Sequence, residues 1–326
     1  MRVSNRCALA GSLLVPLCSQ NPHTQRHTHN KKRRFRGRSK VLLRPRSTKE
    51  VSDILRYCHD RRIAVVPQGG NTGLVGGGVP VSDEVILSTR GLNRIEGFAD
   101  QGILICEAGC VLQDLQDYAA DRNHLVPVDL GAKGTCCIGG NVSTNAGGQY
   151  YYRYGSLHAN VLGLEVVQAD GQILDLMSTN LKDNTGYDLK QLFVGAEGTL
   201  GVVTKVALRC PRLPQARNAA FLACDSFDKV QQTLLLAKDH LGEVLAAFEY
   251  MDQSVLELVA KEKRIPVTND DGNGNRPYPY SVLVETHGSN DEHDSIKMES
   301  FLESAMTKDF VVDGVVAQDR RQLLDM

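Results

Sequence analysis

The sequence predicts a two-domain α+β protein, and three observations support this fold class. Its 326 residues are about twice the length of a typical single domain. Hydrophobic residues make up 42% of the chain, which is enough for packed cores. Short apolar strands alternate with amphipathic helices, and the pair Pro211 and Pro214 separates two stretches of different style.

The cysteines and the apolar runs narrow the class of protein. The chain has nine cysteines, an odd number, and no Cys-x-x-Cys pair. This pattern argues against a complete disulfide framework and against a zinc ribbon, and it fits a reducing compartment. No uninterrupted apolar run approaches the roughly 20 residues of a membrane-spanning helix. We therefore expect a globular protein with no membrane span.

The charges are distributed unevenly along the chain. Residues 1–40 contain ten of the 37 Lys and Arg residues and none of the 38 Asp and Glu residues. The rest of the chain is therefore net acidic and repels nucleic-acid phosphates. Binding of nucleic acid could rest only on the N-terminal tail, and no nucleic-acid partner is expected.

The tail, residues 1–39, has the composition of an organelle transit peptide. It is rich in Arg, lacks acidic residues, and carries Arg2 and Arg6 one helical turn apart before a basic run at 31–38. Apolar residues recur at helical spacing at Val3, Cys7, Ala10, Leu14 and Leu17. Three alternatives stay open: an extension without an address, a secretory signal over residues 8–17, and a nucleic-acid-binding arm.

Organised sequence begins at Lys40, and a first domain is expected over residues 40–214. Ser47 and Glu50 form a capping box for a helix whose apolar face comprises Val51, Ile54, Leu55 and Cys58. The pair Asp170-Gly171 predicts a hairpin between two apolar runs. Strands are expected at residues 41–43, 63–66 as a buried run, 85–87, 103–106, 161–168, 172–176 and 201–208, with a second helix at 111–122.

A second domain is expected over residues 215–326. Its β-α-β alternation resembles a ferredoxin-like sheet, and a polar linker at 268–279 interrupts it. Residues 320–324 have the pattern of a further helix. The expected strands are 219–224, 244–250, 280–286 and 310–316, and the expected helices are 227–240, 253–263 and one that contains Met298, Phe301 and Leu302.

Glycines concentrate in three windows, at residues 69–78, 131–155 and 195–201, which together hold 16 of the 30 glycines. Such windows indicate backbone with positive φ or a close approach by another group. The first window follows an expected strand and could direct its N–H groups at an anion, although a tight surface turn explains it equally well. No Walker motif is present, and in the third window the glycine spacing and the following strand disfavour a Rossmann domain.

The second window favours a ligand-binding role. Two glycine pairs, Gly139-Gly140 and Gly147-Gly148, bracket the small polar residues Ser143, Thr144 and Asn145. Their hydroxyls and amides suit a long, flat ligand that carries phosphates and ring edges. The window offers few apolar anchors, so we expect contact with a ligand to hold it in place.

These windows, together with 153–155 and 197–204, occur in the order and spacing of a known family. They resemble the FAD-binding (PCMH-type) domain of the vanillyl-alcohol oxidase fold. Three further segments resemble the D-2-hydroxyglutarate dehydrogenase branch of that family, at residues 130–134, 182–189 and 247–252. The resemblance implies two α+β subdomains that hold FAD, followed by a substrate-binding cap of which this chain contains an incomplete, ferredoxin-like part.

The resemblance also implies which residues contact FAD. The first loop would hold the pyrophosphate, the second window would run along the flavin, and the third would lie near the adenine. Some relatives link flavin covalently through a His where this chain has Asn71, so non-covalent FAD is implied. The implied cofactor-binding residues are Pro67, Gln68, Gly69, Gly70, Asn71, Thr72, Gly73, Leu74, Gly131, Gly139, Gly140, Asn141, Thr144, Asn145, Gly147, Gly148, Tyr154, Gly155, Glu197, Gly201, Val202 and Val203.

By resemblance, the expected reaction is FAD-dependent oxidation of a D-2-hydroxy acid, most simply D-2-hydroxyglutarate to 2-oxoglutarate, in the mitochondrial matrix. Electrons would pass to electron-transfer flavoprotein. The family's zinc ligands and proton-accepting His are expected beyond residue 326, so no catalytic or metal-binding residue is assigned here. The alternative is a catalytically inactive flavin-binding fragment.

Two histidines remain to be explained. His287 and His293 are the body histidines with a spacing that could suit a metal, but no third ligand follows in a recognisable motif. We expect a surface pair.

Overall fold

The computed structural model describes residues 14–16, 27–29, 34–263 and 278–317. The chain divides into two compact units. The first comprises Met1–Gly147 and Ser156–Arg212, and the second comprises Gly148–Gly155 and Leu213–Met326. No helix in the described ranges has both the length and the apolar character to cross a membrane.

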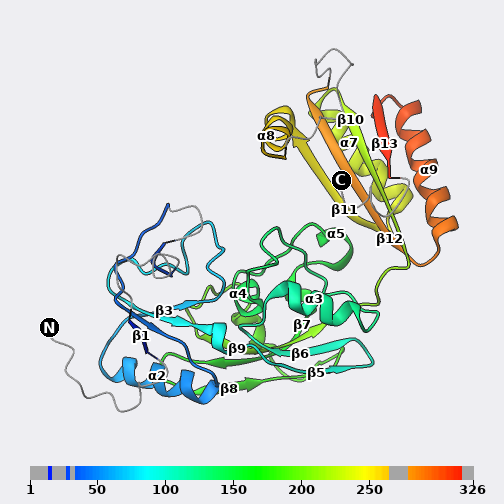
Figure 1. Cartoon of the computed structure of the whole chain (residues 1–326). Helices are drawn as coiled ribbons and strands as arrows, with labels where there is room; N and C mark the ends of the chain where they lie inside the picture. The colour runs from blue at the N-terminus through cyan, green and yellow to red at the C-terminus, as the bar shows by residue number, and fades with distance from the viewer. Residues whose placement is uncertain (1–13, 17–26, 30–33, 264–277, 318–326) are drawn as a thin grey trace. The chain divides into compact units, whose positions relative to one another are not determined.

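The first unit opens with a four-stranded sheet of order β1-β2-β4-β3 (Figure 1). Strands β2, β4 and β3 are parallel, while β1 runs antiparallel to β2. The bounds are β1 Leu14–Pro16, β2 Val41–Leu43, β3 Val65–Gln68 and β4 Val85–Ser88. The helical pattern predicted for the tail is therefore wrong at residues 14–16, which form a strand; residues 1–13 and 17–26 lie outside the described residues.

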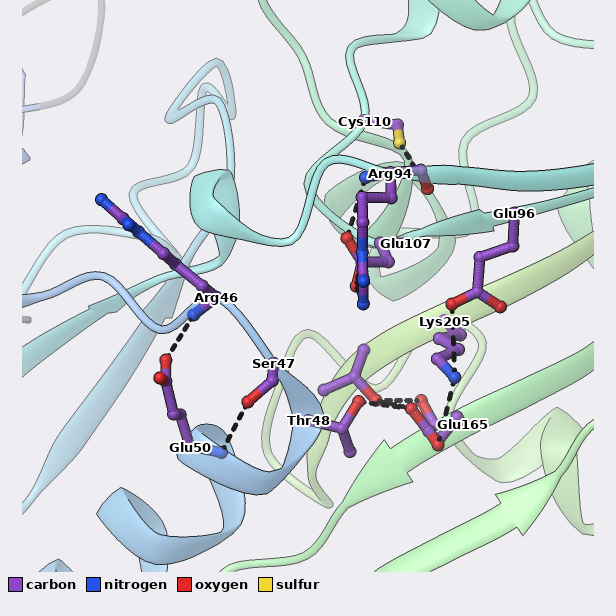
Figure 2. Close-up of polar contacts among 11 residues, drawn as sticks. Arg46, Ser47, Thr48, Glu50, Arg94, Glu96, Glu107, Cys110, Glu165 and Lys205 are labelled. Atoms are coloured by element: carbon purple, nitrogen blue, oxygen red, sulfur yellow. Dashed lines mark hydrogen bonds and ion pairs between the residues drawn. The ribbon is translucent and has the colours of Figure 1, made fainter.

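Helix α2 (Thr48–Asp60) confirms the predicted capping box. The Ser47 hydroxyl accepts a hydrogen bond from the Glu50 N–H at 3.2 Å, and Glu50 in turn accepts one from the Arg46 N–H at 2.7 Å (Figure 2). The helix buries Val51 and Leu55 against residues of both sheets of the first unit. A local polar pattern thus fixes where the helix begins, and its apolar face fixes what it packs against.

The second sheet of the unit has the order β5-β6-β9-β7-β8, with every pair antiparallel. Its bounds are β5 Ile95–Ala99, β6 Ile103–Glu107, β7 Val161–Val167, β8 Ile173–Leu176 and β9 Val202–Arg209. The predicted hairpin is confirmed, because β7 pairs with β8 through a turn in which Gly171 has φ of +84°. The helical elements are η1 Thr89–Gly91, α3 Leu112–Ala120, α4 Ile138–Ser143, α6 Leu157–Asn160 and η2 Leu189–Leu192.

Two buried carboxylates stabilise this unit (Figure 2). Glu107 accepts hydrogen bonds from the Arg94 backbone N–H and guanidinium, each at 2.8 Å. Glu165 on β7 accepts from the Thr204 hydroxyl on β9 at 2.9 Å and from the Thr48 hydroxyl on α2. These bonds compensate for burial of the carboxylates and attach α2 to the five-stranded sheet.

The second unit contains a four-stranded antiparallel sheet of order β11-β12-β10-β13. Its strands are β10 Ala216–Cys224, β11 Leu245–Asp252, β12 Tyr280–Gly288 and β13 Asp313–Val316. Its helices are α5 Tyr151–Tyr154, α7 Phe227–Leu241, α8 Gln253–Lys263 and α9 Asp291–Thr307. Apolar residues of α7 and α9 pack on the sheet around Phe301, and the strand order is that of the predicted ferredoxin-like fold.

Three sequence predictions need correction. The run 63–66 is not a buried strand, since Ile63 is 39% exposed and β3 begins at Val65. Strand β5 was absent from the prediction because Glu96 and Gly97 interrupt its apolar pattern. Packed structure also begins before Lys40: the Gly37 N–H donates to the Thr28 carbonyl at 2.7 Å. The linker residues 268–277 and the residues 320–324 lie outside the described residues.

Candidate cofactor-binding site

The first unit contains a cleft of about 800 Å³, a size typical of pockets for organic cofactors. The carboxyl ends of the parallel strands β3 and β4 contribute Gln68 and Thr89 to its lining. Helix α4, the loop that precedes it and the start of β9 complete the lining. Segments far apart in sequence therefore form one concave surface, and the glycine windows supply most of it.

The first glycine loop is held by close backbone contacts. A Cβ on Gly70 would lie 2.1 Å from the Thr135 carbonyl oxygen, and one on Gly69 would lie 3.3 Å from the Cys137 Cβ. Gly70 thus lets two loops meet at a distance that no side chain permits. By contrast, a Cβ on Gly73 would meet nothing within 4 Å.

Helix α4 carries the second window and corrects one prediction. The window does have apolar anchors, because Ile138 and Val142 are completely buried in the core of the first unit. A Cβ on Gly139 would lie 2.5 Å from the Ala108 Cβ, whereas one on Gly140 would meet nothing within 4 Å. One face of α4 therefore packs tightly, and Gly140 leaves the other side open to the cleft.

Backbone of left-handed conformation concentrates around the cleft. Asn71, Asn145 and Glu197 have φ of +54°, +47° and +52°. Such conformations are unfavourable for residues with a Cβ and are often retained at functional sites. The Glu197 N–H donates to the Ser143 carbonyl at 2.8 Å, so the strained residue is attached directly to α4.

Two polar atoms of the cleft residues are suited to a ligand. Thr89 Oγ1 and Asn141 Oδ1 are buried and have no hydrogen-bond partner within the described structure. Both residues line the cleft. Buried polar atoms are normally paired, so a ligand with hydroxyl or N–H groups would satisfy them.

The lining is nearly neutral. Among the described residues that line the cleft, Glu197 is the one charged side chain. Burial raises the pKa of the Cys137 thiol to about 11, so this cleft residue stays protonated and unreactive near neutral pH. An anionic ligand group here would be held by backbone N–H groups and hydroxyls rather than by Lys or Arg.

The structure brings most of the predicted cofactor residues into this cleft. The residues that line it are Pro67, Gln68, Gly69, Gly70, Asn71, Thr72, Gly73, Leu74, Gly131, Gly139, Gly140, Asn141, Thr144, Glu197, Gly201, Val202 and Val203. Asn145 and Gly147 do not line it, although both are adjacent in sequence to residues that do. Gly148, Tyr154 and Gly155 belong to the second unit.

Sequence reasoning missed several lining residues. These are mainly Thr89, Leu130, Ala132, Cys136, Cys137, Ser143, Ala146 and Gly198. Thr89 could have been found, because it follows β4 at the same sheet edge where the first glycine loop follows β3. The two cysteines have no comparable signal, since their place depends on how their loop packs against Gly69.

The second unit corrects the prediction of a surface histidine pair. The His293 side chain is exposed, but His287 is completely buried. His287 Nε2 lies 2.8 Å from Glu285 Oε1, and His287 Nδ1 lies 2.9 Å from the Tyr154 hydroxyl. Tyr154, predicted as a cofactor residue, is therefore the partner of a buried histidine.

The protonation of this cluster follows from its burial. Burial lowers the pKa of His287 and outweighs the opposing effect of Glu285, while Arg217 and Arg153 lower it further. The neutral ring donates through Nε2 to the carboxylate and accepts the Tyr154 O–H at Nδ1. Within the described residues, no group of three His, Cys, Asp or Glu side chains could hold a metal ion.

Two family models match the chain. Residues 39–177 match the FAD binding domain, and residues 213–326 match the C-terminal domain of FAD linked oxidases. Among solved structures, an alkyldihydroxyacetonephosphate synthase superposes with a TM-score of 0.73 at 16% identity, covering 90% of this chain and 57% of the other. This likeness confirms the predicted fold class.

Curated relatives are much closer in sequence. Mitochondrial D-2-hydroxyglutarate dehydrogenase of Danio rerio is 54% identical over 88% of this chain and 53% of its own length, and that of Rattus norvegicus is 53% identical over 89% and 54%. D-2-hydroxyglutarate–pyruvate transhydrogenase of Saccharomyces cerevisiae is 45% identical over 88% and 58%. The chain spans about half the length of these relatives. The predicted resemblance is thus confirmed, and the chain belongs to the D-2-hydroxyglutarate dehydrogenase family of FAD-linked oxidases.

Proposed function

We propose that the cleft of the first unit binds FAD without a covalent link, in an enzyme that oxidises a D-2-hydroxy acid. The proposed substrate is D-2-hydroxyglutarate and the product is 2-oxoglutarate. One observation supports the cofactor most directly: the cleft combines glycines that leave open space with two unpaired buried polar atoms. Family membership supports the reaction.

The residues of the cleft would divide the cofactor between them. The loop 67–74 would hold the pyrophosphate through backbone N–H groups, which suits a lining with few charges. Gly140 and its neighbours on α4 would admit the flat flavin, since a side chain at that position would occupy the open space. Asn141 and Thr89 would pair their free oxygens with cofactor donors, and residues 201–203 would lie towards the adenine.

When bound, FAD would supply the hydride acceptor. The chain's own residues would position it, exclude water through the buried faces of α4 and β9, and leave the flavin protein neutral at Cys137. We assign no proton-accepting residue within the described structure. Residues 40–214 would form the FAD domain and residues 215–326 the substrate domain.

Non-covalent attachment is proposed because Asn71 stands where some relatives have a linking His. The amide of Asn71 is instead a hydrogen-bond donor, to the His29 carbonyl at 2.7 Å. Acid precipitation of the purified yellow protein tests this. Flavin should remain in the supernatant, and flavin in the protein pellet would contradict the proposal.

Turnover is tested by dye reduction with D-2-hydroxyglutarate, with D-lactate as the comparison substrate and flavin content matched. Zinc is added in parallel, because the family resemblance implies it. Reduction with D-2-hydroxyglutarate supports the dehydrogenase, in the mitochondrial matrix and with electron-transfer flavoprotein as the physiological acceptor. A chain that holds FAD and reduces no dye would instead support the alternative, a catalytically inactive flavin-binding protein.

A further inference from the structure

We infer that residues 27–29 and 34–38 form a structural part of the cofactor site rather than a removable tail. These residues, which precede β2, are called the pre-strand segment below. The inference rests on the proposed function, because it concerns the loop 67–80 that would hold the FAD pyrophosphate. It assigns a positioning role to Gln68 and Asn71.

The strongest contact is at Gln68, which is 2% exposed. Its Nε2 donates to the His27 carbonyl at 2.9 Å and to the Gly78 carbonyl at 2.7 Å. Its Oε1 lies 2.6 Å from His27 Nδ1, and since an amide oxygen only accepts, His27 donates here. Two of the three hydrogen bonds printed for this buried amide therefore depend on His27.

The second contact holds a strained residue. Asn71 has φ of +54° and lines the cleft. Its side-chain Nδ2 donates to the His29 carbonyl at 2.7 Å. This bond favours the left-handed conformation that turns the loop at this point.

Further contacts follow the loop to its far end. Gly76, with φ of +84°, lies so close to Phe35 that a Cβ would be 2.7 Å from the Phe35 Cγ. A Cβ on Gly37 would lie 2.1 Å from the Pro80 carbonyl oxygen. The Arg38 N–H donates to the Ser82 carbonyl at 2.9 Å.

The pre-strand segment is also bonded to itself. The Gly37 N–H donates to the Thr28 carbonyl at 2.7 Å, and His29 and Arg36 form an antiparallel bridge. Its contacts thus reach the glycine loop near both ends and in the middle. A flexible extension would have no reason to match the loop in this way.

Removal of the segment would have a definite cost. Gln68 would keep its bond to Gly78 and lose the rest, and a buried amide left partly unpaired destabilises its surroundings. Asn71 would lose its support beside the cleft. A targeting cut that preserves the site must therefore fall before His27, and Arg34, Arg36 and Arg38 stay on the mature protein.

The test compares the full chain with a chain that lacks residues 2–26 and one that lacks residues 2–37. FAD affinity is measured by flavin fluorescence, and hydrogen exchange of the amides in loop 67–80 is measured without FAD. The first deletion should change neither. The second should weaken FAD binding about tenfold or more and accelerate exchange in the loop.

A variant of the full chain keeps the inference falsifiable if the longer deletion does not fold. Gln68→Leu should weaken FAD binding and accelerate loop exchange in the full chain. In the chain that lacks residues 2–37 it should add little, because both changes break the same bonds. Gln231→Leu, at an exposed position of α7, is the matched control and should have no effect.

Two outcomes would overturn the inference. One is unchanged loop exchange and FAD affinity on deletion of residues 2–37, and the other is the same result for Gln68→Leu in the full chain. If no form binds FAD, the proposed function fails. Faster loop exchange in the longer deletion alone would still support the structural role of the pre-strand segment.

Discussion

The first two glycine windows look alike in sequence but differ in what crowds them. In the first, Gly70 lies against the Thr135 carbonyl, where a Cβ would be 2.1 Å away. In the second, Gly140 lies on a helix whose opposite face buries Ile138 and Val142, and its own side is open. Gly70 is therefore needed for packing, whereas Gly140 keeps space free for a ligand.

This difference separates two reasons for a glycine that a sequence motif treats as one. A crowded glycine stabilises the fold whether or not a ligand is bound. An open glycine contributes little to the empty protein and matters when the ligand arrives. Stability of the apo protein and affinity for FAD should therefore respond to different substitutions.

Gly70→Val should have the largest effect. The new side chain overlaps the Thr135 backbone, so the two loops must separate. We expect the free energy of unfolding of the apo protein to fall by about 3 kcal/mol, measured by urea denaturation. Gly73→Val, at a position with open space around it, is the control, and equal losses from both would contradict the distinction.

Gly140→Val should act on binding. The apo protein should keep its free energy of unfolding within about 1 kcal/mol, because Val is no worse than Gly in a helix. FAD affinity should fall at least about tenfold, equivalent to about 1.4 kcal/mol, because the side chain fills cofactor space. Titration with FAD checks this, and an unfolded apo variant would mean that Gly140 is also a packing residue.

Glu197 tests the strain beside the second window. At φ of +52°, Glu197→Gly should be more stable than Glu197→Ala by about 1 kcal/mol, because Gly adopts this conformation without a Cβ clash. Thermal unfolding of the two variants measures the difference. Equal stability would show that the left-handed conformation costs nothing here.

The segment that follows the second window predicts the smallest effect. Gly148–Gly155 packs within the second unit, where Tyr154 bonds buried His287. Burial lowers the pKa of His287 from its ordinary value of 6.5, so at acid pH the unfolded chain binds the proton more readily. The free energy of unfolding should therefore fall as pH drops below about 6.5, by less than about 1.4 kcal/mol per pH unit.

His287→Gln provides the comparison for this pH dependence. The variant lacks the titrating group, so its unfolding free energy should vary less between about pH 7.5 and about pH 5.5. Chemical denaturation at several pH values gives both slopes. Identical slopes in the two proteins would show that His287 does not contribute.

Local sequence patterns predicted much of the fold. The Ser47 cap set the start of α2, Asp170-Gly171 placed the hairpin, and alternating apolar runs placed the strands of both units. Each of these signals acts over a few residues, through a cap, a turn or the side-chain period of a strand. That is why they could be predicted without knowledge of distant contacts.

The sequence by itself thus determined the fold class, most element positions and the segments that form the cleft. The tertiary structure alone decided why each glycine is there, since Gly70 and Gly140 differ only in neighbours that are distant in sequence or absent. It also decided that His287 is buried beside Tyr154 and that Gln68 bonds His27, 41 positions away. Burial and long-range hydrogen bonds depend on which surfaces meet, and no local pattern contains that information.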